Sequence, residues 1–280
     1  MYYLNHGGII VNFEFYAYFI LLMYNCKNKK SLFMKKLLLI WSLATCLFSA
    51  QLTIPSEDGF ELYGWLEKPV SAKEATPIIL FAHQFGAEHS TWDAIAKEFN
   101  AKGYAALSVD LRGHGKSIFQ NKKEKRVISD VRLDHIKVAL AQSDKKIGFE
   151  KIPSDLIAWL EFISEDETID MKNLYLFGAS LGGGSIIPLL NEYEAKGVVI
   201  LSGGKPKSLE EDINMALASS MSQTLFIASA NDPLGATDIA ISYAKQSILG
   251  TSLIIYGDGH GTVLLPEVKH YIFSFIDNIK

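Results

Sequence analysis

Residues 174–184 read Leu-Tyr-Leu-Phe-Gly-Ala-Ser-Leu-Gly-Gly-Gly, and the fold prediction rests on this segment. The apolar run 174–177 predicts a buried strand, and the apolar residues of 181–193 follow helical spacing. Between them lies a G-x-S-x-G motif centred on Ser180. Small residues flank such a serine because the chain turns sharply from strand to helix, which lifts the hydroxyl above the sheet edge. The motif alone leaves an ordinary serine in a glycine-rich turn as the alternative.

The chain around this motif alternates short apolar runs with longer amphipathic segments, which is typical of βαβ units and a mostly parallel sheet. Residues 52–54 and 60–66 alternate around a turn and predict an antiparallel hairpin at a sheet edge. Apolar runs predict strands buried on both faces at 78–82, 105–109, 174–177, 198–201, 224–228 and 252–256. Helical spacing predicts helices at 91–102, 155–164, 181–193, 237–248 and 266–279. We therefore expect residues 51–280 to form a single α/β domain.

Two later segments supply the partners that a serine nucleophile needs. A general base must take the hydroxyl proton, and His260 lies in a Gly-Asp-Gly-His-Gly loop directly after the last predicted strand. A carboxylate must then orient the imidazole. Asp232 follows the preceding strand and fits best, because Asp238 lies inside the next predicted helix and Asp258 is a turn residue two positions before the base.

The order Ser180, Asp232, His260 is that of nucleophile, acid and base, each after a successive late strand. On these residues the body of the chain, 52–280, resembles an α/β hydrolase. The resemblance implies the α/β-hydrolase fold, in which a mostly parallel central sheet carries helices on both faces, here with an N-terminal antiparallel hairpin.

Two further motifs strengthen the resemblance. Residues 83–86, His-Gln-Phe-Gly, follow a predicted strand at the place where such proteins carry an H-G-x-G-like loop. Residues 110–117, Asp-Leu-Arg-Gly-His-Gly-Lys-Ser, are similar to their D-x-R-G-x-G-x-S turn. The resemblance implies an oxyanion hole formed by the backbone N–H groups of Phe85 and Leu181. It also implies that His83 hydrogen-bonds within its own loop rather than acting as the base. The sequence departs from the pattern at Gln84, where glycine is common.

The connections around the motif narrow the class of hydrolase. Residues 202–222 are too few for the helical lid domain that many hydrolases of this fold insert, so we expect an open site. The longer segment 118–152 is lysine-rich near both ends, which is typical of a solvated face, with steering of an anionic substrate as the alternative. We expect this segment to shape one wall of the pocket. The minimal body is most similar to dienelactone-hydrolase-like proteins and small carboxylesterases, although dienelactone hydrolase has cysteine where Ser180 stands.

The function expected from these features is cleavage of an ester or thioester of a small-molecule acyl substrate through an acyl-enzyme intermediate. Two alternatives remain open: a serine peptidase or amidase of the same fold, and a non-catalytic binding protein that keeps the fold.

Composition excludes several other classes. The 280 residues are 49% hydrophobic and carry a net charge of −4, so no basic excess exists to bind nucleic acid. The only cysteines, Cys26 and Cys46, precede the body, which therefore has no disulfide and no thiolate metal site. Residues 113–117 resemble the end of a phosphate-binding loop, but Asp110 stands where its first glycine is required. The histidines show no metal-ligand spacing, so we expect neither a metal nor a cofactor.

The first fifty residues predict targeting rather than fold. Apolar stretches at 9–24 and 37–48 both fall short of the ~20 residues that cross a bilayer. The second follows Met-Lys-Lys and ends at Ser-Ala, which predicts a secretory signal peptide over 34–50 and a periplasmic or secreted protein. Residues 1–33 would then be an over-long N-terminal extension. The alternative is an uncleaved segment that associates with the membrane as an anchor. Lipidation at Cys46 matches the sequence poorly.

Overall fold

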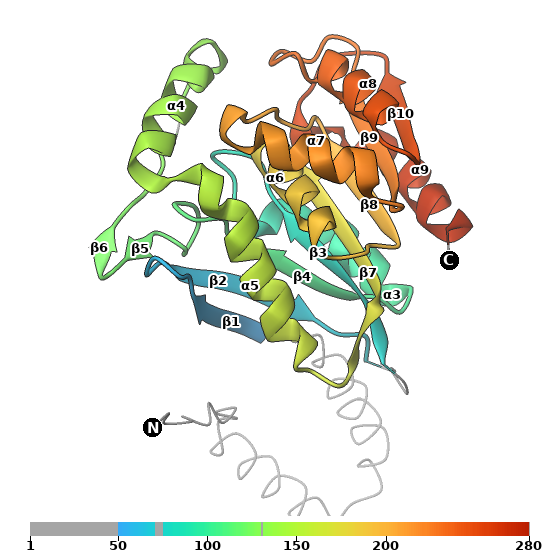
Figure 1. Cartoon of the computed structure of the whole chain (residues 1–280), viewed down its shortest axis with the longest axis horizontal. Helices are drawn as coiled ribbons and strands as arrows, with labels where there is room; N and C mark the ends of the chain where they lie inside the picture. Colours follow the sequence, from blue (N-terminus) through green and yellow to red (C-terminus); the bar gives the residue numbers. More distant parts are fainter. Residues whose placement is uncertain (1–49, 71–74, 130, 280) are drawn as a thin grey trace, which may run out of the picture. The chain divides into compact units, whose positions relative to one another are not determined.

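An eight-stranded sheet forms the centre of the domain, in the order β1-β2-β4-β3-β7-β8-β9-β10 (Figure 1). This computed structural model describes residues 50–70, 75–129 and 131–279. The predicted extension at 1–33 and all but the last residue of the predicted signal peptide lie outside the described residues. The strands are β1 (Ala50–Pro55), β2 (Glu61–Glu67), β3 (Thr76–Ala82), β4 (Ala105–Val109), β7 (Ile169–Ala179), β8 (Gly197–Leu201), β9 (Gln223–Ser229) and β10 (Gly250–Ile255).

The pairing of the strands confirms a mostly parallel sheet with an antiparallel start. Strands β1 and β2 form the predicted hairpin, with Ile54 opposite Leu62, and β2 pairs antiparallel with β4. The pairs β3–β4, β3–β7, β7–β8, β8–β9 and β9–β10 are all parallel. The chain leaves β3 towards β4 on one side and returns as β7 on the other. Open α/β sheets bind ligands at such a reversal of strand order, at the carboxyl ends of the strands.

Helices cover both faces of the sheet, as expected. Side chains alternate along a strand, so in β3 Ile79 and Phe81 enter one core while Ile78 and Leu80 enter the other. The helices α3 (Asp93–Ala101) and α9 (Leu265–Asn278) contribute buried residues to the first core. The second core takes buried residues from α5 (Ile152–Ser164), α6 (Leu181–Ile186), α7 (Glu210–Ser219) and α8 (Ala236–Gln246).

The last strand differs from its prediction. An apolar run at 252–256 indicates a strand buried on both faces, but β10 is the edge of the sheet, and Thr251 and Ser252 are exposed. Edge strands need less apolar surface than central ones, and the run itself does not reveal its position in the strand order.

Two helices lie in segments where no helix was predicted. In 118–152 a short hairpin, β5 (Phe119–Gln120) with β6 (Lys123–Glu124), precedes α4 (Ile136–Ile147). Helix α4 buries only three residues, so its apolar stripe is narrow. In 202–222, α7 buries Ile213, Ala216 and Leu217 in the core beside α8, so it is a crossover helix of the α/β fold. Short 3₁₀ segments complete the connections: η1 (His89–Trp92), η2 (Leu133–His135), η3 (Phe149–Lys151), η4 (Ile187–Asn191), η5 (Lys207–Leu209) and η6 (Gly261–Leu264).

A buried guanidinium joins three parts of this architecture. Arg112, in the loop after β4, is 1% exposed and binds Asp155 of α5 through Nε and Nη2 at 2.6 and 2.7 Å. Its Nη1 and Nη2 also donate to Asp58, in the turn of the N-terminal hairpin, at 3.1 and 3.2 Å. The guanidinium carbon lies 4.9 Å from the centre of the Phe60 ring. The arginine of the D-x-R-G motif therefore holds the hairpin and α5 against the loop after β4.

Replacing this arginine removes the positive partner of two carboxylates. We expect Arg112→Met to lower the free energy of unfolding by about 3–5 kcal/mol, because Asp155 remains buried without compensation. Urea unfolding followed by circular dichroism measures the change. Arg126→Met is the matched control, since Arg126 pairs with Glu124 at the surface and its loss should cost under about 1 kcal/mol. A loss at Arg112 no larger than at Arg126 would contradict the structural role.

Asp58 makes stability depend on pH. Burial raises the pKa of its carboxyl, but hydrogen bonds from Arg112 and Ser56 outweigh burial and hold the pKa at about 2. An unfolded chain binds this proton near pH 4. The stabilisation is therefore complete above about pH 4 and is lost as the pH falls towards 2. The difference in unfolding free energy between wild type and Asp58→Asn should shrink between pH 6 and pH 3. For the exposed Asp134→Asn it should stay small throughout, and an equal shrinkage there would argue against the assignment.

Candidate active site

Ser180 occupies a strained turn between β7 and α6. Its backbone has φ 47° and ψ −108°, a left-handed region that residues with a Cβ rarely adopt. The strain is held by hydrogen bonds on both sides of the residue: its N–H donates to Leu201 O at 2.9 Å, and its carbonyl accepts from the N–H groups of Gly184 and Gly204, each at 2.9 Å. Strained backbone of this kind persists only where surrounding contacts determine it, and it concentrates at functional sites.

The glycines on either side of Ser180 are required by close approaches of backbone. A Cβ on Gly182 would lie 2.4 Å from the carbonyl oxygen of Ala82, at the end of β3. A Cβ on Gly178 would lie 2.7 Å from the Cα of Gly183. The N–H of Gly182 donates to His83 O at 3.1 Å. The elbow therefore packs directly on the loop that follows β3.

The structure brings the three predicted residues together. His260 Nε2 lies 2.7 Å from Ser180 Oγ, and His260 Nδ1 lies 2.9 Å from Asp232 Oδ2 and 3.0 Å from Oδ1. With the ring proton on Nδ1, the imidazole donates to the carboxylate and accepts the serine proton at Nε2. The three side chains follow β7, β9 and β10. Because these strands are parallel, their carboxyl ends lie at the same end of the sheet, and the three residues meet there.

Asp232 is built to stay ionised. Its side chain is inaccessible to solvent, and its Oδ1 accepts from the N–H of Leu234 at 2.9 Å and of Ala236 at 3.3 Å. Burial alone would raise the pKa of the carboxyl, but the hydrogen bond and charge of His260 together with the hydrogen bond from Leu234 N–H hold the pKa below its ordinary value. Of the three aspartates considered from the sequence, the imidazole contacts this one.

The two backbone N–H groups predicted for the oxyanion hole are free of internal acceptors. Within the described ranges, neither Phe85 N–H nor Leu181 N–H donates a hydrogen bond. Leu181 adjoins the serine, and Phe85 lies in the loop on which the elbow packs. Unused donors next to a reactive serine are suited to a developing negative charge, because they need no rearrangement when that charge forms.

His83 has the structural role expected from the resemblance. Its Nδ1 lies 2.7 Å from the carbonyl oxygen of Gln84, and its Nε2 accepts from the N–H of Leu111 at 3.0 Å. Burial lowers the pKa of His83 to about 4, so the ring is neutral. Both ring nitrogens are occupied by the backbone, and the ring fixes the loop that carries Phe85 against the loop after β4.

Sequence reasoning missed one polar contact beside the site. Gln84, where glycine was expected, directs its side-chain amide to Thr262, with Nε2 3.0 Å from Thr262 Oγ1. The signal for this contact was the departure from the family pattern itself, but the partner lies 178 residues away.

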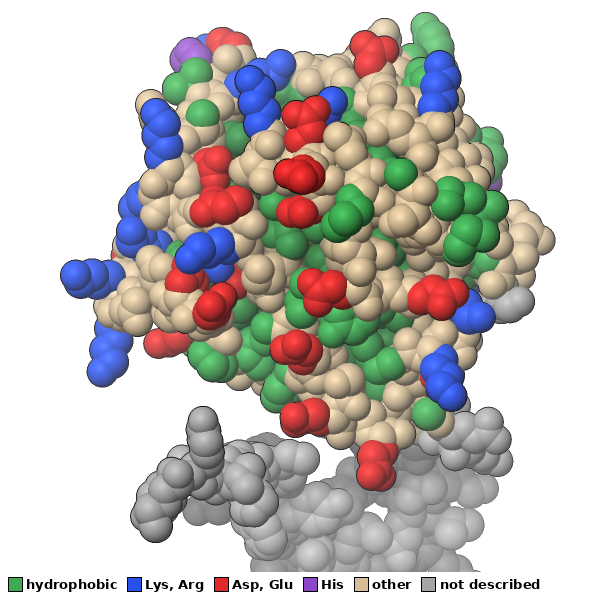
Figure 2. Space-filling model, in the orientation of Figure 1, with side chains coloured by type: hydrophobic (Ala, Val, Ile, Leu, Met, Phe, Trp, Pro, Cys, Tyr) green, Lys and Arg blue, Asp and Glu red, His purple; other side chains and the backbone are tan. Residues whose placement is uncertain are grey.

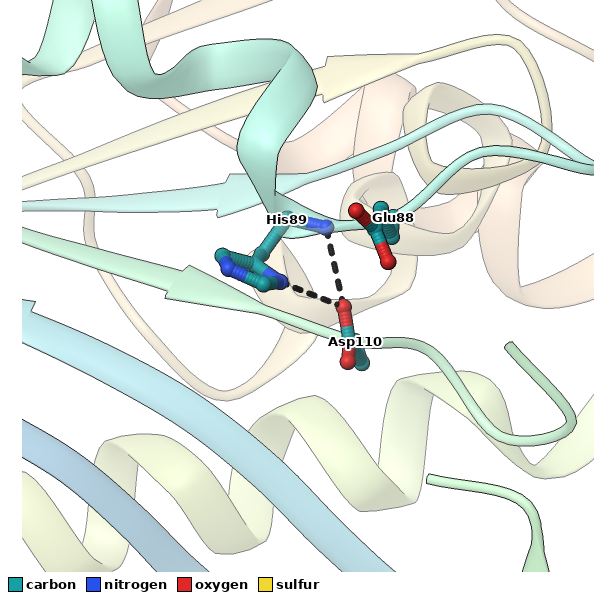
Figure 3. Close-up of side chains that lie close together, drawn as sticks. All are labelled: Glu88, His89 and Asp110. Atoms are coloured by element: carbon teal, nitrogen blue, oxygen red, sulfur yellow. Dashed lines mark hydrogen bonds and ion pairs between the residues drawn. The ribbon is translucent and has the colours of Figure 1, made fainter. Parts of the chain in front are cut away.

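A second histidine–aspartate pair joins η1, which follows β3 and begins at His89, to Asp110 in the loop after β4. Among the described residues, Glu88, His89 and Asp110 have potential metal-ligand atoms within 4.8 Å of one another (Figure 3). Figure 3 shows the backbone N–H and ring Nδ1 of His89 both joined to Asp110, and each lies 2.9 Å from Asp110 Oδ1. Asp110 Oδ2 accepts from the N–H of Lys116 at 2.7 Å, and the His89 ring stacks on Trp65. These contacts explain the group as a structural link without an ion.

A cavity of about 260 Å³ lies beside the same loops. Its lining combines Gly86, Ala87, Glu88 and Thr91 after β3, the turn 113–115 after β4, and Arg126, Val127 and Ser129. The segment 118–152 thus forms one wall of a cavity next to the loop that carries Phe85. The lining is mostly backbone and polar side chains. Figure 2 shows one face of the domain, on which blue side chains gather along the flank formed by β5, β6 and α4.

Together, the parallel sheet, the reversal of strand order and the strained serine elbow define an α/β hydrolase. Within that class, a model of the family described as serine aminopeptidase S33 matches residues 73–226, which is more than half of the chain. The chain belongs to this family. No curated protein gives a significant sequence match.

Solved structures share the fold at low sequence identity. Est1E from Butyrivibrio proteoclasticus is 16% identical, with a TM-score of 0.61 over 82% of this chain and 99% of its own. Esterase Pf2001 from Pyrococcus furiosus is 15% identical, with a TM-score of 0.60 over 83% and 91%. An acetyl xylan esterase from Paenibacillus sp. R4 is 14% identical, with a TM-score of 0.58 over 85% and 90%.

No helix in the described part of the chain has the length and apolarity to span a membrane.

Proposed function

We propose that this protein is a serine hydrolase that cleaves a carboxylic ester or thioester through an acyl-enzyme intermediate. The observation that carries the proposal is the 2.7 Å contact between Ser180 Oγ and His260 Nε2, with Asp232 2.9 Å from the other ring nitrogen. A serine hydroxyl is a weak nucleophile unless a base takes its proton, and this arrangement supplies the base already oriented.

The proposed reaction has two halves. Ser180 Oγ attacks the substrate carbonyl carbon while His260 Nε2 takes its proton, and Asp232 stabilises the resulting imidazolium. The N–H groups of Phe85 and Leu181 bind the oxyanion of the tetrahedral intermediate. That intermediate collapses as the bond to the leaving group breaks, and His260 returns the proton to the departing oxygen or sulfur. A water molecule, deprotonated by His260, then attacks the acyl carbon. The bond between the acyl carbon and Ser180 Oγ breaks, His260 returns the proton to Oγ, and the acid is released.

Two observations bear on the substrate. Several solved neighbours are named esterases, which supports an ester, whereas the matched family is described as serine aminopeptidase, which supports an amide bond at an amino terminus. Parallel assays with p-nitrophenyl esters, acyl thioesters and aminoacyl p-nitroanilides distinguish these candidates. A dominant kcat/KM for the anilides would replace the ester proposal by the peptidase. A non-catalytic binding protein is disfavoured, since it would retain the strain at Ser180 without use.

Fluorophosphonate labelling tests the nucleophile. We expect stoichiometric labelling of the full chain at Ser180, because the probe reacts with a serine activated by a base. Ser180→Ala should abolish labelling and lower kcat by at least about 10⁴-fold with the fold intact. Intact mass, peptide mapping and circular dichroism measure these outcomes. Ser219→Ala, on the exposed end of α7, is the control and should label and turn over like wild type. Labelling at a serine other than Ser180 would show that the nucleophile lies elsewhere in the chain.

Exchange of the carboxylates tests the proposed acid. Asp232→Asn should lower kcat by about 10³- to 10⁴-fold, because the amide does not hold the tautomer in which Nε2 is a base. Asp238→Asn and Asp258→Asn should stay within about twofold of wild type. A larger loss at Asp238 or Asp258 would contradict these roles.

A further inference from the structure

Gln84 is held at both its backbone and its side chain. The residue follows His83 in the loop after β3, and its carbonyl accepts from His83 Nδ1 at 2.7 Å and from Ala87 N–H at 3.2 Å. Its half-buried amide reaches the loop after β10, where Nε2 lies 3.0 Å and Oε1 3.1 Å from Thr262 Oγ1. The N–H of Thr262 also faces Gln84 Oε1 at 3.4 Å. Since both amide atoms are engaged, the orientation of the side chain is defined.

The loop that receives this amide carries His260. Three of its glycines, Gly257, Gly259 and Gly261, have φ of 113°, 135° and 65°. Glycine backbone loses more conformational freedom on ordering than any other, so such a loop depends on contacts from outside. Before His260, the carbonyls of Gly257 and Gly259 accept from Asn231 N–H and Ser229 Oγ at 3.1 and 2.8 Å.

After His260, Leu264 packs into the core, and the Gln84 amide supplies hydrogen bonds from outside the loop. A Cβ on Gly261 would lie 3.1 Å from Gln84 Oε1, so the amide packs directly against the residue next to the histidine. Thr262, one position further, takes the hydrogen bonds. The same glutamine precedes Phe85, whose N–H is one of the two free donors of the site.

We propose that Gln84 is a positioning residue that connects the loop carrying the Phe85 N–H to the loop carrying His260. This Gln84–Thr262 connection fixes the position of the oxyanion donor relative to the base. This proposal rests on the proposed function, because it assigns Gln84 a role in that reaction. The glutamine does not touch the reacting atoms. It acts through Thr262 on one side and through its own backbone on the other.

A double-mutant cycle tests the Gln84–Thr262 connection. We expect Gln84→Ala and Thr262→Val each to lower kcat about 10-fold, the loss expected when one hydrogen bond no longer restrains a catalytic loop, with KM changed less than about twofold. The double variant should lose no more than either single variant, because both remove one interaction. Rates are expressed per fluorophosphonate-reactive site, so that a fraction of unfolded protein does not count. Gln246→Ala, which removes an exposed amide on α8, is the control and should match wild type.

A variant of similar length supplies a readout that separates hydrogen bonding from packing. Gln84→Met keeps the length of the side chain but has no amide to bind Thr262, so its kcat should fall about as far as that of Gln84→Ala. A kcat for Gln84→Met equal to that of wild type would show that the side chain acts through packing and would contradict the proposal.

Hydrogen–deuterium exchange tests the Gln84–Thr262 connection without any measurement of turnover. Gln84→Ala and Thr262→Val should each increase exchange in a peptide covering 257–264, while a peptide covering α7 stays as in wild type. Absence of labelling at Ser180 in wild type would refute the proposed function. The exchange data would still show whether the Gln84–Thr262 connection restrains the histidine loop. The proposal would be overturned if the kcat losses of the two single variants multiplied in the double variant. Unchanged exchange at 257–264 in both single variants would also overturn it.

Discussion

The backbone of Ser180 is the constraint on which the rest of the site depends. A residue with a Cβ at φ 47° costs of order 1–3 kcal/mol and persists only when its surroundings leave no alternative. Here the surroundings are the neighbouring strand ends. Leu201, the last residue of β8, accepts the serine N–H, and the carbonyl of Ala82 at the end of β3 leaves no room for a side chain on Gly182. The parallel sheet thus holds Ser180 in its strained conformation. This conformation places the hydroxyl above the carboxyl ends of the strands.

The strand order explains why the site assembles where it does. Strand β3 supplies the loop with Phe85, its neighbour β7 supplies Ser180, and β9 supplies Asp232 two strands further along. Adjacent strands are about 4.8 Å apart, so β7 and β9 are separated by about 10 Å. The imidazole of His260, delivered from the edge strand β10, bridges this interval between hydroxyl and carboxylate.

A histidine–aspartate contact is not by itself diagnostic of chemistry in this protein. His260–Asp232 and His89–Asp110 have the same 2.9 Å contact through Nδ1. They differ in what lies beyond the ring: His260 Nε2 faces Ser180 Oγ, whereas the His89 ring stacks on Trp65 with its backbone N–H on the same carboxylate. The first pair is oriented towards a hydroxyl, and the second joins two loops.

The sequence alone determined the alternation of strands and helices, the hairpin, the elbow at Ser180 and the order of its partners, because these depend on local periodicity and on turns that require glycine. It also indicated Asp232 over Asp238 and Asp258, an inference from position that became a contact only in the folded chain. The edge position of β10, the helices α4 and α7, and the Gln84–Thr262 contact were decided by the tertiary structure. Burial at an edge and a hydrogen bond across 178 residues are set by which elements become neighbours in space, and local sequence carries no record of those neighbours.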